Sequence, residues 1–190
     1  MKNALILHGT DNTSKDSWYL WLSKELERAG YKVWVPDLPG ADRPSVKRYN
    51  RFIFGSDWKF DKDSIIVGHS SGAVATLGLL QALPEDVQVK AVYLVASFKD
   101  DLGWEVLKGL FTEPFDFDLI KKRSKKLVFI HSDNDPYCPL DHARYLHKKL
   151  GGDLIVLKGQ KHFSTSTYGE KYRKFPFLAE LILGKRQTRS

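Results

Sequence analysis

The chain has 190 residues, of which 42% are hydrophobic and 28% are charged, and its formal net charge at pH 7 is +7. The length predicts one globular domain spanning residues 1–190, and the composition excludes wholesale disorder, a membrane span of ~20 apolar residues and an internal disulfide, since Cys138 is the single cysteine. With no cleavable signal peptide pattern after Met1, we expect a cytoplasmic protein without a membrane partner, either a monomer or a homodimer.

Short apolar runs alternate with amphipathic segments along the chain. Helical spacing of apolar residues predicts helices over 18–29, 74–83, 143–150 and 177–182. The apolar runs are rich in Val, Ile and Leu, which predicts strands buried on both faces, as in a parallel sheet. These runs are 4–8, 32–35, 64–68, 91–96, 126–131 and 153–157. The alternation predicts an α/β fold, a three-layer α/β/α sandwich with right-handed crossovers.

Two regions do not follow this alternation. Segment 42–60 is polar, basic and aromatic, and we interpret it as a helix with irregular ends. Segment 98–123 joins two strands through Gly103, Gly109 and Pro114. We expect short helices there, lying over the C-terminal edge of the sheet.

Positive charge is densest in segment 121–126, and Lys185, Arg186 and Arg189 add to it near the C-terminus. Basic character alone would allow a nucleic acid or an anionic surface as partner. No nucleic-acid-binding motif accompanies these cations. We therefore predict a solvated helix end before a strand and a frayed C-terminus, not nucleic-acid binding.

The third apolar run leads into Gly68-His69-Ser70-Ser71-Gly72, and an apolar helix follows. This is a G-x-S-x-G pattern in the strand–turn–helix context that presents a nucleophilic serine. So sharp a turn requires a strained backbone at Ser70, and side chains two positions before and after it would collide. Ser70 also lies at a helix N-terminus, which favours developing negative charge. Ser70 is therefore the candidate nucleophile.

A serine hydroxyl needs a base to become a good nucleophile. In this fold the expected chain order is serine, acid, histidine, so His8 and His69 come too early. We expect His69 to lie inside the turn and point elsewhere. His162 follows the last predicted strand, in a loop from which an imidazole can reach the serine from above. His162 is therefore the candidate base.

The acid should follow the penultimate strand, where two aspartates compete. We favour Asp135, because Pro136 and Pro139 stiffen the loop after it. Asp133 is the alternative, although it could instead cap the turn by accepting backbone N–H groups. Asp100 or Asp101, after the preceding strand, is a weaker third option. The acid holds the histidine tautomer and stabilises the imidazolium.

Two backbone N–H groups should hold the oxyanion of such a reaction. One belongs to Ser71, directly after the nucleophile, and the other to the loop after the first strand. Gly9 permits a close approach there, and we choose the N–H of Thr10. No C-x-x-C, H-E-x-x-H or Gly-rich nucleotide-binding pattern occurs, so we expect no metal and no cofactor.

With these residues the sequence resembles the retinoblastoma-binding protein 9 and YdeN-type serine hydrolases. The segments that carry the resemblance are 8–9 (HG), 18–26 (WYLWLSKEL), 68–73 (GHSSGA), 111–114 (FTEP), 135–139 (DPYCP) and 159–163 (GQKHF). The resemblance implies an α/β-hydrolase fold with six parallel strands in the order 2-1-3-4-5-6 and a minimal lid. It also implies the triad roles of Ser70, Asp135 and His162. The retinoblastoma association rests on an L-x-C-x-E segment, which Cys138 does not provide.

We therefore expect a serine hydrolase of the carboxylesterase type, which cleaves small esters or amides through an acyl-enzyme. The partner is a small acyl substrate. Trp104 and Phe163 are the candidate pocket residues because they lie in loops, whereas the core is the better interpretation for most other aromatic residues. The alternatives are an aminopeptidase-like hydrolase and a binding module that keeps the fold with little catalysis.

Overall fold

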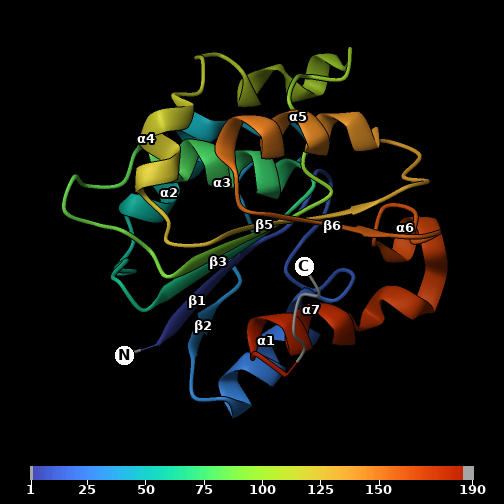
Figure 1. Ribbon diagram of the computed structural model, residues 1–190, viewed down its shortest axis with the longest axis horizontal. Coiled ribbons are helices and arrows are strands. Elements are labelled where there is room, and N and C mark those ends of the chain that lie inside the picture. The colour runs from blue at the N-terminus through green and yellow to red at the C-terminus, as the bar shows by residue number, and fades with distance from the viewer. Residues whose placement is uncertain (1, 186–190) are drawn as a thin grey trace.

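A parallel sheet forms the centre of the computed structural model, which describes residues 2–185 (Figure 1). Its strand order is β2-β1-β3-β4-β5-β6, as the family resemblance implied. The six strands are β1 (Asn3–Leu7), β2 (Lys32–Trp34), β3 (Ser64–His69), β4 (Ala91–Val95), β5 (Leu127–Ser132) and β6 (Asp153–Leu157). Each predicted strand is confirmed, with ends that differ by no more than one residue.

Helices cover both faces of the sheet (Figure 1). On one face lie α2 (Val46–Phe54), α3 (Ser71–Gln81), α4 (Phe117–Lys122) and α5 (Leu140–Leu150); on the other lie α1 (Tyr19–Arg28), α6 (Thr165–Tyr168) and α7 (Pro176–Ile182). Two 3₁₀ helices, η1 (Glu105–Leu110) and η2 (Gly169–Arg173), complete the elements. The three-layer α/β/α sandwich is therefore confirmed. None of the helices within residues 2–185 has the length and apolar character needed to cross a membrane.

The core consists of two layers because successive side chains of a strand point to opposite faces. In β1, Leu5 and Leu7 pack under α2 and α3, while Ala4 and Ile6 pack against α1. Every residue of β3 is buried. This central, fully covered strand is the one that leads into Ser70, so the serine lies at the end of a rigid element.

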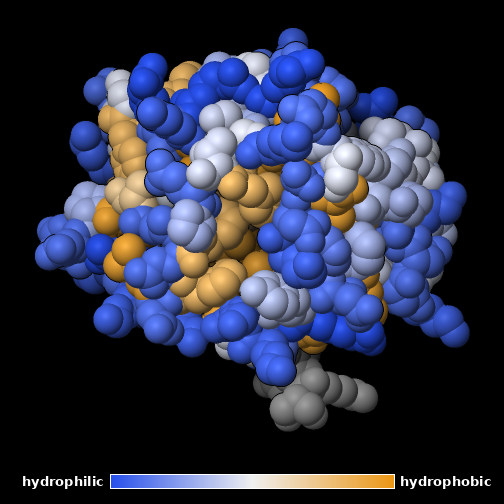
Figure 2. Space-filling model, turned by 90° about the horizontal axis from the view of Figure 1, so that it is seen from above, coloured by the Kyte–Doolittle hydropathy of each residue, from blue (hydrophilic) through white to orange (hydrophobic). Residues whose placement is uncertain are grey.

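The two irregular regions form the short helices that the sequence predicted. In the first, α2 begins after Ser45, whose hydroxyl accepts a hydrogen bond from the N–H of Arg48. In the second, η1 and α4 follow one another along segment 98–123. Figure 2 views the face that carries α2 to α5 and shows apolar side chains gathered in a hollow, with hydrophilic residues around it.

The basic segment 121–126 contains the end of α4 and the turn that leads into β5, which confirms the predicted helix end before a strand. Lys121 pairs with Asp118 at 3.5 Å and Lys126 with Asp153 at 3.4 Å, both with exposed side chains. Arg123 differs from these, because it is buried and donates a 2.6 Å hydrogen bond to the carbonyl of Glu85. Of the C-terminal cations named above, Arg186 and Arg189 lie outside the described residues.

Candidate active site

Ser70 occupies a sharp turn between β3 and α3. Its backbone has φ 55° and ψ −122°, a left-handed conformation that a residue with a side chain rarely adopts, which confirms the predicted strain. The turn requires glycine at positions 68 and 72, because a side chain at either position would collide with the backbone. A Cβ at Gly68 would lie 2.5 Å from the carbonyl oxygen of Gly72, whereas a Cβ at Gly72 would overlap the carbonyl groups of Leu7 and His8 at the end of β1. The turn is therefore packed directly onto the first strand.

His162 and Asp135 form a buried hydrogen-bonded pair. The ring Nδ1 of His162 lies 2.8 Å from Oδ2 of Asp135, so Nδ1 carries the proton and Nε2 is left as an acceptor. The other Asp135 oxygen accepts the N–H groups of Tyr137 and Cys138, at 2.9 and 3.0 Å. Burial disfavours the charged carboxylate, but the hydrogen bond from the His162 ring and those from these N–H groups outweigh it and lower the pKa of Asp135.

A second set of contacts fixes the loop that carries His162. We call residues 132–138 the acid loop and residues 158–164 the base loop. Three consecutive side chains of the acid loop accept hydrogen bonds from three consecutive N–H groups of the base loop: Ser132 from Gln160 (2.9 Å), Asp133 from Gly159 (2.7 Å) and Asn134 from Lys161 (2.8 Å). Asp133 thus accepts a hydrogen bond from a backbone N–H group, as the sequence analysis predicted for it if it were not the acid. The two loops are held together independently of the His162–Asp135 pair.

The other candidate acids lie in different contacts. Asp100 pairs with Lys99 at 2.5 Å and faces His142, and Asp101 accepts the N–H of Gly103 at 2.9 Å. Among the described residues, Asp135 is the carboxylate that meets His162.

Ser70 and His162 line the same cavity of about 270 Å³. Within residues 2–185 the Ser70 hydroxyl makes no hydrogen bond to the ring of His162; such contacts are often long without substrate and tighten when it binds. The cavity is lined by Thr10, Asp11, Asn12, Ser70, Phe98, Leu102, Trp104, Leu107, Tyr137, Cys138, His162, Ser164 and Ser166. It therefore combines the candidate nucleophile and base with apolar and aromatic side chains and with several small polar residues.

The two candidate oxyanion donors also adjoin Ser70. Thr10 lines the cavity, and Ser71 is the first residue of α3. Neither backbone N–H donates a hydrogen bond to another described residue. A Cβ at Gly9 would come within 3.2 Å of the Ser70 Cβ, which explains why the smallest residue stands where this loop passes the serine.

Of the two predicted pocket residues, Trp104 lines the cavity and Phe163 does not. Trp104 is 47% exposed at the cavity mouth. Phe163 has φ 53°, and its side chain points away from the cavity. It packs in the apolar layer between the sheet and helices α1 and α7. There its ring is fully buried and stacks on Phe175 at 5.4 Å. Phe163 is therefore a core residue, whereas Phe98 is buried and also lines the cavity.

Tyr137 is a site residue that the sequence reasoning missed. Its ring stands nearly perpendicular to the ring of His162, with centroids 5.0 Å apart, and it contacts Trp104 in the same way at 5.9 Å. The signal was present in the sequence, because Tyr137 belongs to the same short motif as Asp135. The two aromatic side chains thus extend the wall of the cavity outward from the histidine.

Among the described residues, one group has the atoms to hold a metal ion: Asp135, Cys138 and His162, whose ligand atoms lie within 4.8 Å of one another. The donor set fits a metal poorly. Both Asp135 oxygens already accept hydrogen bonds, and burial raises the pKa of the Cys138 thiol, which disfavours the thiolate that metals bind. The chemistry of these groups favours the acid–base pair.

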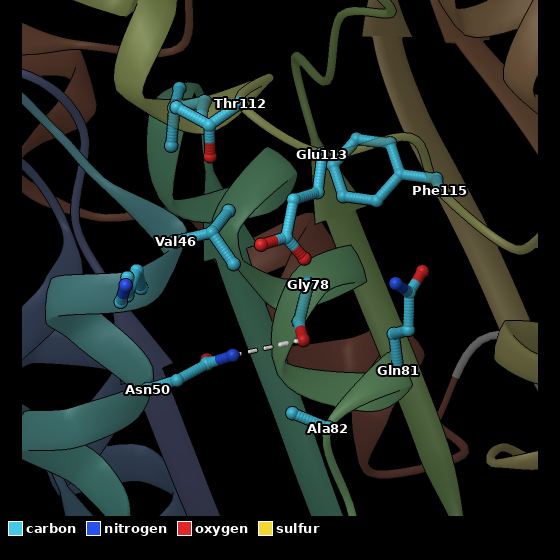
Figure 3. A pocket seen from close by; sticks show the side chains of 10 residues that line it. Val46, Asn50, Gly78, Gln81, Ala82, Thr112, Glu113 and Phe115 are labelled. Carbon is cyan, nitrogen blue, oxygen red and sulfur yellow. Dashed lines mark hydrogen bonds between the residues drawn. The ribbon is translucent and has the colours of Figure 1, made fainter.

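A second cavity, of about 320 Å³, opens at the other end of α3 (Figure 3). Val46 and Asn50 reach it from α2, and Gly78 lines it from α3. The Asn50 amide donates a 3.1 Å hydrogen bond to the carbonyl of Gly78. None of the candidate catalytic residues lines this cavity, so it is separate from the site at Ser70.

The chain is similar in sequence to known proteins. A family model described as "Serine hydrolase" matches residues 4–180. The chain is 27% identical over 171 residues to the serine hydrolase RBBP9 of Rattus norvegicus, which covers 87% of this chain and 88% of that protein.

Solved structures show the same architecture. The ydeN gene product of B. subtilis matches with a TM-score of 0.88 at 21% identity, covering 98% of this chain and 100% of that chain. Est1E from Butyrivibrio proteoclasticus, with ferulic acid bound, matches with a TM-score of 0.70 at 16% identity, covering 96% and 90%. These likenesses establish the α/β-hydrolase fold for the chain.

Proposed function

Because this chain belongs to the serine hydrolase family, we propose that it cleaves small carboxylic esters through an acyl-enzyme intermediate on Ser70. The observation that carries the proposal is the 2.8 Å hydrogen bond between His162 and Asp135, at a cavity that also contains Ser70. It fixes the tautomer in which Nε2 of His162 can accept the serine proton.

The reaction proceeds in two halves. In the first, Oγ of Ser70 attacks the ester carbonyl carbon and its proton passes to Nε2 of His162. The N–H groups of Thr10 and Ser71 stabilise the oxyanion, and His162 then protonates the departing alcohol. In the second half, water attacks the acyl carbon and gives a proton to His162; the bond to Oγ of Ser70 then breaks, Oγ takes that proton from His162, and the carboxylic acid is released. Asp135 stays ionised throughout and stabilises the imidazolium.

The shape of the cavity favours small or aromatic acyl groups. Its apolar wall includes Phe98, Trp104 and Tyr137, and a volume of about 270 Å³ accommodates a single ring. Est1E was solved with ferulic acid, an aromatic acid, bound. We therefore place aryl acids beside short aliphatic acids as the acyl groups to test first.

A fluorophosphonate probe tests the nucleophile directly. We expect it to label wild type at Ser70, and Ser70→Ala to lose both labelling and the hydrolysis of p-nitrophenyl esters. Equal behaviour of the two proteins would contradict the proposal and favour a binding module that retains the fold. Tyr93→Phe, at a buried position of β4 outside the cavity, is a suitable control for handling and folding.

The choice between ester and amide requires a substrate panel. p-Nitrophenyl esters of acetate, butyrate and benzoate can be compared with aminoacyl p-nitroanilides at equal concentration. Faster turnover of the esters supports the proposal. Turnover confined to the anilides would assign the same site to an aminopeptidase-like hydrolase.

A further inference from the structure

Two adjacent residues before and at the start of α1, Trp18 and Tyr19, are fully buried beneath the serine turn. The indole N–H of Trp18 donates a 2.9 Å hydrogen bond to the carbonyl of Phe163. The hydroxyl of Tyr19 lies 2.7 Å from Nδ1 of His69, the residue before the serine. Both side chains thus reach toward the machinery around Ser70, although neither lines the cavity.

His69 extends this contact to the base loop. Its Nε2 lies 2.8 Å from the main-chain carbonyl oxygen of His162, 93 residues further along the chain. At the other end, the backbone N–H of Gly9 donates to the Tyr19 hydroxyl at 3.4 Å. A continuous chain of hydrogen bonds therefore runs from Gly9 through Tyr19 and His69 to His162.

The direction of each proton in this chain follows from its ends. A carbonyl oxygen only accepts, so Nε2 of His69 carries a proton. Burial, reinforced by the neighbouring His162, lowers the pKa of His69 to about 3, so the ring is neutral and Nδ1 accepts from Tyr19. Burial also raises the pKa of Tyr19, so its hydroxyl keeps its proton while its oxygen accepts from Gly9. Every donor in this series of hydrogen bonds therefore has one acceptor, and the protons can be placed in only one way.

The three segments joined in this way each carry one part of the proposed reaction. Gly9 precedes the candidate oxyanion donor Thr10, His69 precedes the nucleophile, and the carbonyl of His162 belongs to the candidate base itself. We propose that Tyr19 and His69 are positioning residues, whose hydrogen bonds fix two segments relative to Ser70: the base loop, and the loop after β1 that carries Gly9 and Thr10. This inference rests on the function proposed above. Apolar side chains of similar size would fill the same space but would not fix these distances.

The protonation state of His69 provides a test that does not depend on activity. In ¹⁵N-histidine-labelled wild type, His131 should also carry its proton on Nε2, because that atom lies 2.8 Å from the carbonyl oxygen of Cys138. The His69 ring should give a separate signal that stays neutral, with its proton on Nε2, from about pH 7.5 down to about pH 5. His69→Gln should remove that signal and so assign it. A His69 ring that protonates in this range, or that carries its proton on Nδ1, would overturn the proposal.

The positioning role itself is tested through the rate at which a fluorophosphonate labels Ser70, which needs no known substrate. Tyr19→Phe should fold but react about 10 to 100 times more slowly, because small displacements of reacting groups cost that much. His69→Gln keeps one donor and one acceptor, so it should retain more reactivity than His69→Leu. Tyr93→Phe makes the same chemical change at a buried tyrosine that takes no part in these hydrogen bonds. This control variant should react at the wild-type rate.

Thermal unfolding of each variant separates folding from positioning. A folded Tyr19→Phe protein that is labelled as fast as wild type would overturn the positioning role. If wild type itself is not labelled, the proposed function fails instead. In that case the NMR experiment still decides whether the hydrogen-bonded chain exists.

Discussion

Asp133 accepts a 2.7 Å hydrogen bond from the backbone N–H of Gly159, which lies 26 residues further along the chain. Two residues after it, Asp135 binds the ring of His162. The acid loop therefore has two neighbouring carboxylates with different tasks: one holds the base loop, and the other holds the imidazole. This difference can be measured.

Asp135→Asn should lower kcat for p-nitrophenyl esters by about 10³- to 10⁴-fold, because an amide favours the wrong histidine tautomer. Asp133→Asn is the matched control. Its amide oxygen can still accept the N–H of Gly159, so we expect a loss of no more than about tenfold. Steady-state kinetics of the two variants, after a check of folding by circular dichroism, gives the comparison. A larger loss for Asp133→Asn would exchange the two roles.

The strained backbone of Ser70 predicts a trade between stability and activity. Glycine adopts φ 55° and ψ −122° without strain, whereas alanine does not. Ser70→Gly should therefore be about 1–2 kcal/mol more stable to urea unfolding than Ser70→Ala, and both should be inactive. An alanine variant as stable as the glycine variant would mean that the turn stores no such strain.

Trp104 should affect substrate choice more than stability. Its side chain is 47% exposed and forms the outer end of the aromatic wall. For benzoate esters, Trp104→Ala should raise KM about fivefold, since one aromatic contact contributes about 1 kcal/mol. Acetate esters do not reach this wall and serve as the control. An equal effect on both esters would argue against an aromatic acyl site.

Buried histidines should make the protein less stable in mild acid. Burial lowers the pKa of His8, His69 and His131 below 6.5, so between about pH 6.5 and pH 4 the unfolded chain binds more protons than the folded one. The unfolding free energy therefore falls as the pH falls, by about 1.4 kcal/mol per pH unit for each histidine that stays neutral. The lowered pKa of Asp135 acts at lower pH, because its stabilising contribution is lost only as that carboxylate protonates.

Urea unfolding at about pH 7.5 and about pH 5 measures this effect. His69→Gln removes one of the three histidines, and its loss of stability between these pH values should be smaller than that of wild type by about 2 kcal/mol. The same loss in both proteins would mean that His69 protonates in the folded state.

The sequence predicted the strands well because a parallel sheet covered on both faces needs continuous apolar runs, and these are visible in the chain. The start of α3 was less clear. The apolar pattern begins at Val74, yet the helix begins at Ser71, where the serine turn and not hydrophobicity determines the boundary. Helices α6 and η2 were not predicted, because the polar segment 164–173 has no apolar period.

The candidate site was predictable where chain order determines it and unpredictable where tertiary contacts do. Ser70, Asp135 and His162 each follow a strand, and parallel strands end at one edge of the sheet. The side chain of Phe163 could not be placed, because its direction depends on a single positive φ. The contacts of His69 with Tyr19 and His162 span 50 and 93 residues, and nothing local in the sequence indicates them.

The long separations between partners also determine when the site can form during synthesis. A nascent chain that has emerged only as far as β5 contains the serine turn, but it lacks the side chain of His162. It also lacks the carbonyl groups of Phe163 and His162, which accept hydrogen bonds from Trp18 and His69. The indole of Trp18 and the imidazole of His69 therefore remain without those acceptors until the base loop has been synthesised, and a nucleophile at Ser70 would have no base before then.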